Sequence, residues 1–410
     1  MTRDVILTVS LLFIGGLSAR FIADLLRVPE MLVLVGVGAL LGPSLLDVVD
    51  VPFESLGAQL IFTLGVSAIL FYGGLNLSLT VLRKVALGLG LLAVPGVILT
   101  TLIVGVTAHT VFDFSWTEAL LIGAVLSPTD PAILIPLFLK SRLRPKVAQT
   151  VIAESAFNDP TGAVLALAFA GVLISGESSL TGPAQDFVVD LGISTVLGIV
   201  AGILLSAVIS SRRVGIWRES SAIAVLTIVS IGYFSLDSAG GSGYLGAFIA
   251  GLIVGNMEIL GLAMHADHEH DMKSFAANLA DIVTLFVFLV LGANLPFQAI
   301  WDDMLPALAV LATLLFVARP ITVLACTLPD RGALWTRNEL LFLCWTRETG
   351  VVPAALVGVL AGLGMPNNEV FASVVALAII LTLTVQALPA GVIARRLGLL
   401  EPAPDAATPI

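Results

Sequence analysis

The feature that most restricts the fold of this sequence is a series of apolar runs that recurs from one end to the other. Each run is about 20 residues long, which is the length of a helix that crosses the hydrocarbon core of a bilayer. Apolar residues make up 58% of the chain and charged residues only 12%, unlike the composition of a water-soluble domain. We therefore predict an all-α polytopic membrane protein.

Thirteen spans can be placed along the chain. We expect them to form one transmembrane unit over residues 1–400, followed by a disordered tail over 401–410 and without a separate soluble domain. The first run superficially resembles a signal peptide, but it stays apolar through Leu26, so we expect a retained first helix. The spans lie near residues 5–26, 31–46, 56–75, 85–108, 117–138, 147–174, 187–210, 219–236, 243–262, 274–293, 304–327, 338–363 and 369–394.

Positive charges in the loops predict the orientation of the chain. If the loop after the first span is cytoplasmic, Arg3 is the only basic residue of the opposite side, so the N-terminus lies outside and the C-terminus inside. The cytoplasmic set is Arg27, Arg83, Lys84, Lys140, Arg142, Arg144, Lys146, Arg212, Arg213, Arg218, Lys273, Arg331, Arg337, Arg395 and Arg396.

The net charge and the two cysteines limit the kinds of partner that we expect for the chain. A net charge of −10 without a basic stripe outside these loops gives no reason to expect a nucleic-acid partner. Cys326 and Cys344 both lie in apolar segments, so we expect core residues rather than a disulfide or a metal pair. Membrane lipid is the expected surrounding, and we expect neither a cofactor nor enzymatic activity.

Two short patterns recur at a similar offset. Gly74-Leu-Asn-Leu77 resembles Gly292-Ala-Asn-Leu295, and Thr129-Asp-Pro131 has a counterpart in Thr349-Gly-Val-Val-Pro353. We predict two inverted six-helix repeats with crossed discontinuous helices, the plan of many secondary transporters. Repeat one covers about 5–174, a linking helix about 187–210, and repeat two about 219–394.

The sixth span carries polar residues in its middle, at Ala153–Gly162. Ser155, Asn158, Asp159 and Gly162 share one face of a helix. Pro160 has no N–H and leaves the carbonyl of the residue four positions earlier without its donor. This face therefore offers hydroxyl, amide, carboxylate and carbonyl oxygens, the ligands that a hard cation prefers.

The fifth span contains two prolines, Pro128 and Pro131, which cannot both sit in an unbroken helix. They leave Thr129 and Asp130 at a break in the helix. Unwound backbone within a membrane is stable only where it is buried in protein or lines a water-filled cavity. A packing kink is the simpler alternative. An acid at the kink favours an ion pathway instead.

Asp159 is the candidate carrier. Burial disfavours its charged form and a bound cation favours it, so a proton and a cation compete for one carboxylate. Glu154 lies on a different side of that helix and needs a cationic partner, for which Arg319 is the best candidate, as a structural ion pair.

Other polar groups in the spans have less definite roles. Arg347 and Glu348 are adjacent and so face different ways on a helix, and a structural role and one in orienting the site are equally open. Tyr72, Asn76 and Asp281 are candidate cavity-lining groups. The stretch His265–Asp271 is expected to be a solvated cytoplasmic loop, with metal binding or pH sensing as the alternative.

Ser127-Pro-Thr-Asp-Pro131 together with Glu154-Ser-Ala-Phe-Asn-Asp-Pro160 resembles the monovalent cation:proton antiporter family, specifically its NhaP-like sodium/proton exchangers. The resemblance extends over essentially all thirteen spans. It implies a homodimer with a dimerisation domain and a six-helix core domain that moves like an elevator.

The resemblance also implies roles for single residues. The cation is bound at Asp159 with help from Thr129, Asp130 and Ser155, whereas Asn158 is associated with electroneutral one-for-one exchange. Glu154 and Arg319 match the ion pair of the family.

Two departures from the family pattern affect the cavity. Many relatives carry Gly-Leu-Arg-Gly-Ala where this chain has Arg347-Glu-Thr-Gly-Val351, so Thr349 replaces an arginine that here lies two residues earlier. Many sodium-selective relatives have an acid where Tyr72 stands. Some similar antiporters move potassium.

Our hypothesis is therefore an antiporter of the inner membrane that exchanges Na⁺, K⁺ or Li⁺ for H⁺, with Na⁺ as the first choice. A sodium-coupled symporter of an organic anion is the alternative, but it would need more cationic groups in its cavity. An intramembrane aspartyl protease that uses two of Asp130, Asp159 and Asp281 would carry motifs that do not occur here. A passive channel is a further alternative, and a transport rate far above that of carriers would reveal it.

Overall fold

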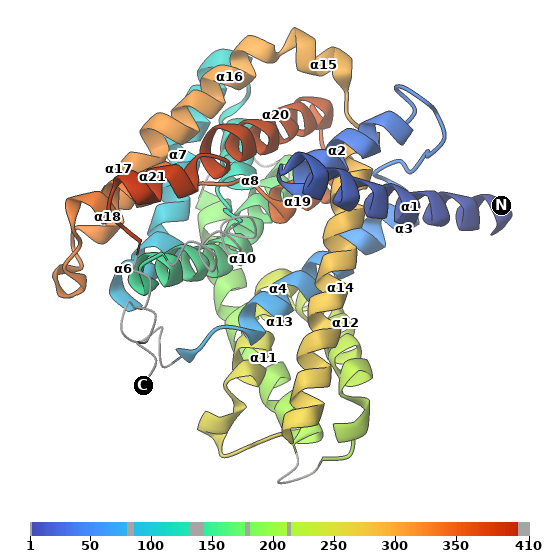
Figure 1. Cartoon of the computed structure of the whole chain (residues 1–410), viewed down its shortest axis with the longest axis vertical. Coiled ribbons are helices and arrows are strands. Elements are labelled where there is room, and N and C mark those ends of the chain that lie inside the picture. Colours follow the sequence, from blue (N-terminus) through green and yellow to red (C-terminus); the bar gives the residue numbers. More distant parts are fainter. Residues whose placement is uncertain (1, 80–85, 131–142, 177–180, 211–214, 401–410) are drawn as a thin grey trace, which may run out of the picture.

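The computed structural model describes residues 2–79, 86–130, 143–176, 181–210 and 215–400, and within them the regular structure is helical. An isolated bridge between Leu143 and Leu400 is the one β-type pairing of these residues. The helices form two bundles that meet near the centre of the molecule (Figure 1).

One bundle, which we call the frame, combines helices of the first 75 residues with helices of residues 181–293 (Figure 1). It consists of α1 (Thr2–Leu26), α2 (Glu30–Leu41), the continuous α3 (Leu56–Leu60), η1 (Ile61–Gly65) and α4 (Val66–Leu75), then α11 (Thr181–Ile209), α12 (Ser221–Ser238), α13 (Gly243–Gly255) and α14 (Ala266–Ala293).

The other bundle, which we call the core, contains the proline-rich segments. It consists of α6 (Ala86–Ala93), α7 (Pro95–Phe112), α8 (Trp116–Leu126), α10 (Pro145–Ser175), the continuous α16 (Met304–Thr313), η4 (Leu314–Ala318) and α17 (Arg319–Thr327), α18 (Arg337–Trp345), α19 (Val351–Gly362), and the continuous α20 (Asn368–Leu381), η6 (Thr382–Ala387) and α21 (Ala390–Arg396). Short connections are η2 (Arg218–Ser220), η3 (Met257–Leu260), α15 (Phe297–Asp302) and η5 (Arg331–Ala333).

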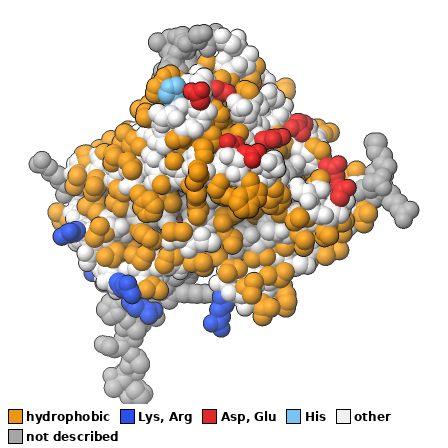
Figure 2. Space-filling view, turned by 90° about the horizontal axis from the view of Figure 1, so that it is seen from above, with side chains coloured by type: hydrophobic (Ala, Val, Ile, Leu, Met, Phe, Trp, Pro, Cys, Tyr) orange, Lys and Arg blue, Asp and Glu red, His pale blue; other side chains and the backbone are white. Residues whose placement is uncertain are grey.

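The lengths of these helices fit a multi-pass membrane protein. Among the described residues, nine helices are long and apolar enough to cross a bilayer, and four shorter apolar helices accompany them. Figure 2 shows hydrophobic side chains in a broad band, with the visible Lys and Arg along one rim and Asp and Glu along the other. The total of thirteen spans stays a prediction, because residues 131–142 lie outside the described ranges.

Several residues that define the predicted orientation also lie outside the described ranges. They are Arg83, Lys84, Lys140, Arg142, Arg212 and Arg213, together with the predicted tail over 401–410. The orientation itself therefore stays a prediction.

The sequence similarity between residues 74–77 and 292–295 has a counterpart in the packing. A Cβ atom on Gly74 would lie 2.2 Å from the carbonyl oxygen of Phe248 in α13, and one on Gly292 would lie 2.2 Å from that of Val35 in α2. Each glycine thus lets a helix of one predicted repeat touch the backbone of a helix of the other. In this way α4 packs closely against α13, and α14 packs closely against α2.

Both interrupted segments lie in the core, and their breaks contact each other. α8 ends at Leu126, before Pro128, while α18 and α19 are separated by residues 346–350. The backbone N–H of Asp130 donates a hydrogen bond to the carbonyl oxygen of Glu348, 3.0 Å away. The Asp130 carboxylate accepts one from the N–H of Val351, at 3.2 Å, the first residue of α19. The predicted crossed discontinuous helices are therefore present.

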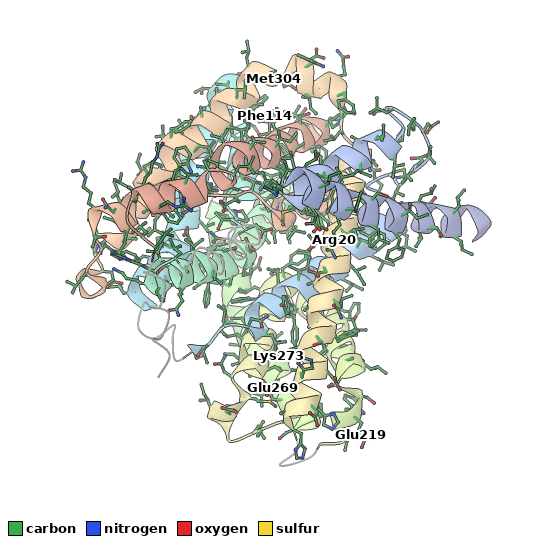
Figure 3. All side chains as sticks on the ribbon, in the orientation of Figure 1. Arg20, Phe114, Glu219, Glu269, Lys273 and Met304 are labelled. Carbon is green, nitrogen blue, oxygen red and sulfur yellow. The ribbon has the colours of Figure 1, made fainter. Side chains whose placement is uncertain are left out.

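The interpretation of His265–Asp271 as a loop is wrong. Ala266 begins α14, and Glu269 forms an ion pair of 2.6 Å with Lys273 one turn later (Figure 3). Asp267 and Glu269 lie in the first turn, where negative charge stabilises a helix N-terminus. Among the described residues no cluster of three or more His, Cys, Asp or Glu side chains is arranged to hold a metal ion.

Candidate ion-binding site

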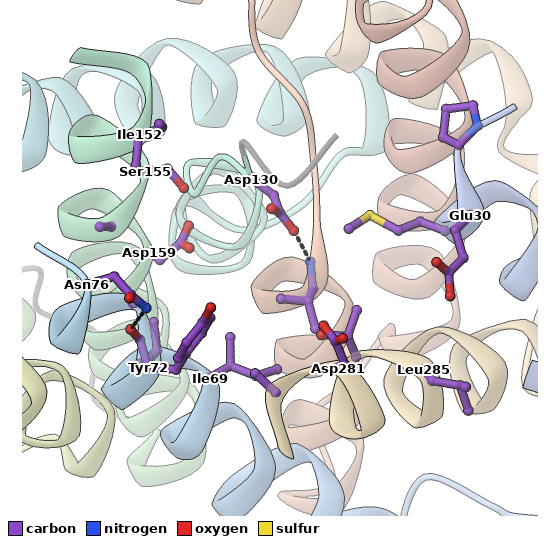
Figure 4. A pocket seen from close by; sticks show the side chains of 18 of the residues that line it. Glu30, Ile69, Tyr72, Asn76, Asp130, Ile152, Ser155, Asp159, Asp281 and Leu285 are labelled. Atoms are coloured by element: carbon purple, nitrogen blue, oxygen red, sulfur yellow. Dashed lines mark hydrogen bonds between the residues drawn. The ribbon is translucent and has the colours of Figure 1, made fainter. Parts of the chain in front are cut away.

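A cavity of about 700 Å³ lies between the two bundles. The frame contributes residues of α1, α2, α4, α13 and α14, and the core contributes residues of α10, Asp130 from the break after α8, and Val351 at the start of α19. Figure 4 shows Asp130, Ser155 and Asp159 around the core side of this cavity, and Tyr72, Asn76 and Asp281 along the frame side.

The charged groups that line the cavity are mostly acidic. Arg20 is the one basic residue of the described lining, and its Nε lies 2.9 Å from Oε1 of Glu30. The acids of the lining are Asp24, Glu30, Asp130, Asp159 and Asp281. An excess of one sign of charge in a cleft raises the local concentration of the opposite ion, here a cation.

The polar face of α10 packs against the break after α8. The hydroxyl of Ser155 donates a hydrogen bond to the carbonyl oxygen of Thr129. The amide of Asn158 brackets the same residue, since its oxygen accepts from the N–H of Thr129 at 3.2 Å and its nitrogen donates to the Thr129 hydroxyl at 2.9 Å. Gly162 leaves room for Pro128, whose Cγ would lie 2.6 Å from a Cβ there.

Asp159 is the acid that this arrangement leaves available. Its Oδ1 is buried and has no hydrogen-bond partner among the described residues. It lies one turn from Ser155 on the cavity wall (Figure 4). Ala156 also lines the cavity. Its carbonyl has no helical donor, because the residue four positions later is Pro160, which has no N–H. A buried carboxylate oxygen without a partner is costly unless it binds a proton or a cation.

The five residues assigned to ion binding from the sequence lie together, but in two layers. Asp130, Ser155 and Asp159 line the cavity, whereas Thr129 and Asn158 are buried behind them. Both ends of the Asn158 amide are bonded to Thr129, and this residue is not part of the described cavity lining.

Glu154 points away from the cavity and pairs with Arg319 of α17. Both side chains are buried, and the guanidinium contacts both carboxylate oxygens, the second contact being 3.1 Å from Nη2 to Oε2. The Nε of Arg319 donates to the carbonyl oxygen of Leu343 in α18, 2.9 Å away. The pair thus ties α10, α17 and α18 together within the core.

Of the accessory residues predicted from the sequence, Tyr72 lines the cavity. Arg347, Glu348 and Thr349 do not line it, because they are buried where the two breaks cross. Arg347 donates to two carbonyl oxygens at the end of α8, whereas Oε1 of Glu348 and Oγ1 of Thr349 have no hydrogen-bond partner among the described residues.

Sequence reasoning missed a contact between the bundles at the other end of the α3–η1–α4 helix. The side-chain amide of Gln59 donates to the carbonyl oxygens of Phe53, at 2.7 Å, and of Gly358 in α19, at 2.8 Å. The ring of Phe62 lies so close to Gly358 that a Cβ there would be 2.1 Å from it. An isolated glutamine near a helix start carries no sequence signal for such a contact.

Comparison with known proteins places these features in context. Residues 9–396 match the family described as "Sodium/hydrogen exchanger, transmembrane". The chain is 28% identical to the K⁺/H⁺ antiporter NhaP of Alkalimonas amylolytica, over 99% of this chain and 69% of that protein. It is also 28% identical to the K⁺/H⁺ antiporter NhaP2 of Shewanella sp. strain ANA-3, over 92% of this chain but only 65% of that protein.

Two comparisons with an archaeon agree with this match. The chain is 28% identical to the probable Na⁺/H⁺ antiporter 2 of Methanocaldococcus jannaschii, over 85% of this chain and 82% of that protein. The structure of the sodium proton antiporter MjNhaP1 from the same organism has a TM-score of 0.81 and 24% identity, covering 96% of this chain and 99% of that one. This similarity concerns the fold.

Proposed function

The chain belongs to the sodium/hydrogen exchanger family, and we propose that it exchanges a monovalent cation for protons across a membrane, with Asp159 carrying one or the other. The observation that supports this role most is the buried Oδ1 of Asp159, which lies on the cavity wall without a hydrogen-bond partner among the described residues. Family membership gives no support to a sodium-coupled organic-anion symporter.

The chemistry follows from competition at one carboxylate. A cation at Asp159 would be completed by oxygen ligands from Ser155, Thr129 and Asp130, which suit a hard ion. A proton on Asp159 removes the charge that holds the cation, so the two are not bound together. If the site reorients only with one of them bound, movement of the cation requires return of a proton.

Alternating access is supported by a difference between the two ends of the site, one of which is open and the other closed. The cavity reaches Asp159 from the side of Tyr72 and Asn76, while the contact of Gln59 and Phe62 with Gly358 closes the bundles at the far end of the same frame helix. We propose that the core moves against the frame like an elevator, and that the frame forms the interface of a homodimer.

The transported cation and the stoichiometry of exchange can each be tested directly. The curated relatives are named as K⁺/H⁺ and Na⁺/H⁺ antiporters, and the two K⁺/H⁺ relatives above are longer than this chain. We propose Na⁺ as the cation, and a comparison of Na⁺, Li⁺ and K⁺ in one proteoliposome assay tests this choice. We also propose that one cation is exchanged for one proton. Such exchange moves no net charge, so its rate should not change with an imposed membrane potential.

The location that we propose is the inner membrane, with the N-terminus outside and the C-terminus in the cytoplasm. The separation of basic and acidic side chains on opposite rims of the hydrophobic band supports this orientation (Figure 2). Labelling of single cysteines placed on each rim of the protein in intact cells tests it.

The decisive test of the carrier is reconstitution of the Asp159→Asn variant. Lumenal pH is followed after a pulse of cation, and we expect no exchange above empty liposomes, because an amide neither releases a proton nor neutralises a cation. Asp302→Asn, at an exposed position at the end of α15, is the matched control and should exchange normally. Normal exchange by Asp159→Asn would remove this residue from its role.

A further inference from the structure

Leu126 and Ser127 are two residues at the end of α8 whose backbone carbonyls lack their helical donors. The carbonyl of Ser127 would need an N–H at position 131, which is a proline and has none. The carbonyl of Leu126 would need the N–H of Asp130, which donates instead to the carbonyl oxygen of Glu348 across the crossing. Buried carbonyls without donors are costly, so another group has to satisfy them.

One side chain from the other break satisfies both. Nη2 of Arg347 lies 2.5 Å from the carbonyl oxygen of Leu126 and 3.0 Å from that of Ser127. We propose that Arg347 is a positioning residue for ion exchange, which fixes the end of α8 and through it the oxygen atoms of Thr129 beside Asp159. This inference rests on the proposed exchange function.

The buried guanidinium of Arg347 is paired with a helix end instead of a carboxylate. Its side chain is only 3% exposed, and no Asp or Glu of the described residues lies within ion-pair distance of it. Its sequence neighbour Glu348 is not within ion-pair distance of it, and Oε1 of that residue has no hydrogen-bond partner among the described residues. The partner of the guanidinium is therefore the C-terminal end of α8, where the helix dipole and the unpaired carbonyls carry partial negative charge.

The path from Arg347 to the ion site is short. Pro128 and Thr129 directly follow the carbonyls that Arg347 holds, and the Thr129 carbonyl accepts from Ser155 next to Asp159 on the cavity wall. A shift of the α8 end would therefore move the Thr129 oxygens relative to Asp159. Charge-assisted hydrogen bonds to a planar guanidinium are well suited to prevent such a shift.

The position of this arginine also accounts for a departure from the family pattern. Thr349 stands where many relatives have arginine, and here its N–H donates to the hydroxyl of Thr382 at 3.0 Å. In this chain the arginine lies two residues earlier and reaches the opposite half-helix. We infer that the displaced arginine fulfils the positioning requirement from position 347.

The test is the cation dependence of exchange in proteoliposomes for Arg347→Gln and Arg347→Lys. For Arg347→Gln we expect the apparent KM for the cation to rise about tenfold, as two charge-assisted hydrogen bonds are lost, while the maximal rate falls much less. Arg347→Lys keeps the charge but not the planar donor and should lie between Arg347→Gln and wild type. Arg144→Gln, at an exposed arginine near the start of α10, is the matched control and should keep the wild-type KM.

The direction of the KM change separates positioning from the alternatives. Removal of a nearby positive charge alone would strengthen cation binding, so a lower KM in Arg347→Gln would overturn the proposal. A merely structural role would lower the maximal rate and the thermal stability at unchanged KM, which would overturn it as well. Absence of exchange by the wild-type protein would instead contradict the proposed function.

A second variant keeps the test informative if Arg347→Gln folds poorly. Arg347→Gly combined with Thr349→Arg restores the arginine position of many relatives. We expect the double variant to show a cation KM closer to wild type than Arg347→Gly alone. A KM no better than that of the single variant would contradict the inference that an arginine at either position holds the end of α8.

Discussion

The side-chain amide of Gln59 in the frame donates a hydrogen bond to the backbone carbonyl of Gly358 in the core, 2.8 Å away. The same amide also donates to Phe53 within the frame. If the core moves against the frame, this bond and the contact of Phe62 with Gly358 have to break each time the site opens toward that end.

Weakening this contact should favour the conformation that is open on the Gln59 side. Loss of one neutral hydrogen bond, about 0.5–1.5 kcal/mol, predicts a shift of the equilibrium by roughly twofold to tenfold for Gln59→Leu. The measurement is the labelling rate of a single cysteine placed at Ala361, after replacement of Cys326 and Cys344. Gly358→Ala, whose methyl would collide with Phe62, should increase labelling further. Unchanged labelling in both variants would show that this contact is not a gate.

The buried pair of Glu154 and Arg319 should matter for stability more than for transport. Removal of one partner by Glu154→Ala or Arg319→Ala leaves an unpaired buried charge and should destabilise the fold by about 3–5 kcal/mol. Glu154→Leu combined with Arg319→Met removes both charges and should recover most of the thermal stability. Thermal unfolding in detergent and exchange in proteoliposomes are measured together. A stable double variant that does not exchange ions would instead assign the pair a direct role in transport.

Gly350 gives Asp130 its place at the crossing. A Cβ on Gly350 would lie 2.0 Å from Oδ2 of Asp130, the oxygen that accepts from the N–H of Val351. Gly350→Ala should therefore displace this carboxylate and reduce exchange at least tenfold, on the order of the effect of a misplaced reacting group. The matched control is Gly171→Ala in α10, where a Cβ would meet nothing within 4 Å. It should keep full exchange and be slightly more stable, by up to about 1 kcal/mol. Equal rates for the two variants would contradict the requirement for close approach at Gly350.

The parts of this structure that could be predicted from the sequence follow from strong local rules. Two prolines three residues apart force a break, so the unwound segment at Thr129 and Asp130 could be located from the sequence. Spacing alone places Ser155, Asn158 and Asp159 on one face of α10. Since a buried carboxylate needs a cation, Glu154 and Arg319 could be named as partners before their distance was known.

The parts that could not be predicted depend on how distant segments cross. The contact of Arg347 with the carbonyls of Leu126 and Ser127 exists only because the two breaks meet, and spacing within one helix does not reveal that. Spacing along α10 likewise does not reveal that both ends of the Asn158 amide are bonded to Thr129. At His265–Asp271 a dense run of charges was interpreted as a loop, although its acids favour the first turn of a helix.

The central claim is that one proton and one cation compete for Asp159, and the apparent KM of the cation as a function of pH tests it most directly. A proton on the carboxylate excludes the cation, so the KM should rise as the pH falls. In the range where Asp159 is mostly protonated, it should rise tenfold per pH unit, with an unchanged maximal rate at saturating cation. A KM that stays constant while the maximal rate falls with pH would contradict competition at a single carboxylate.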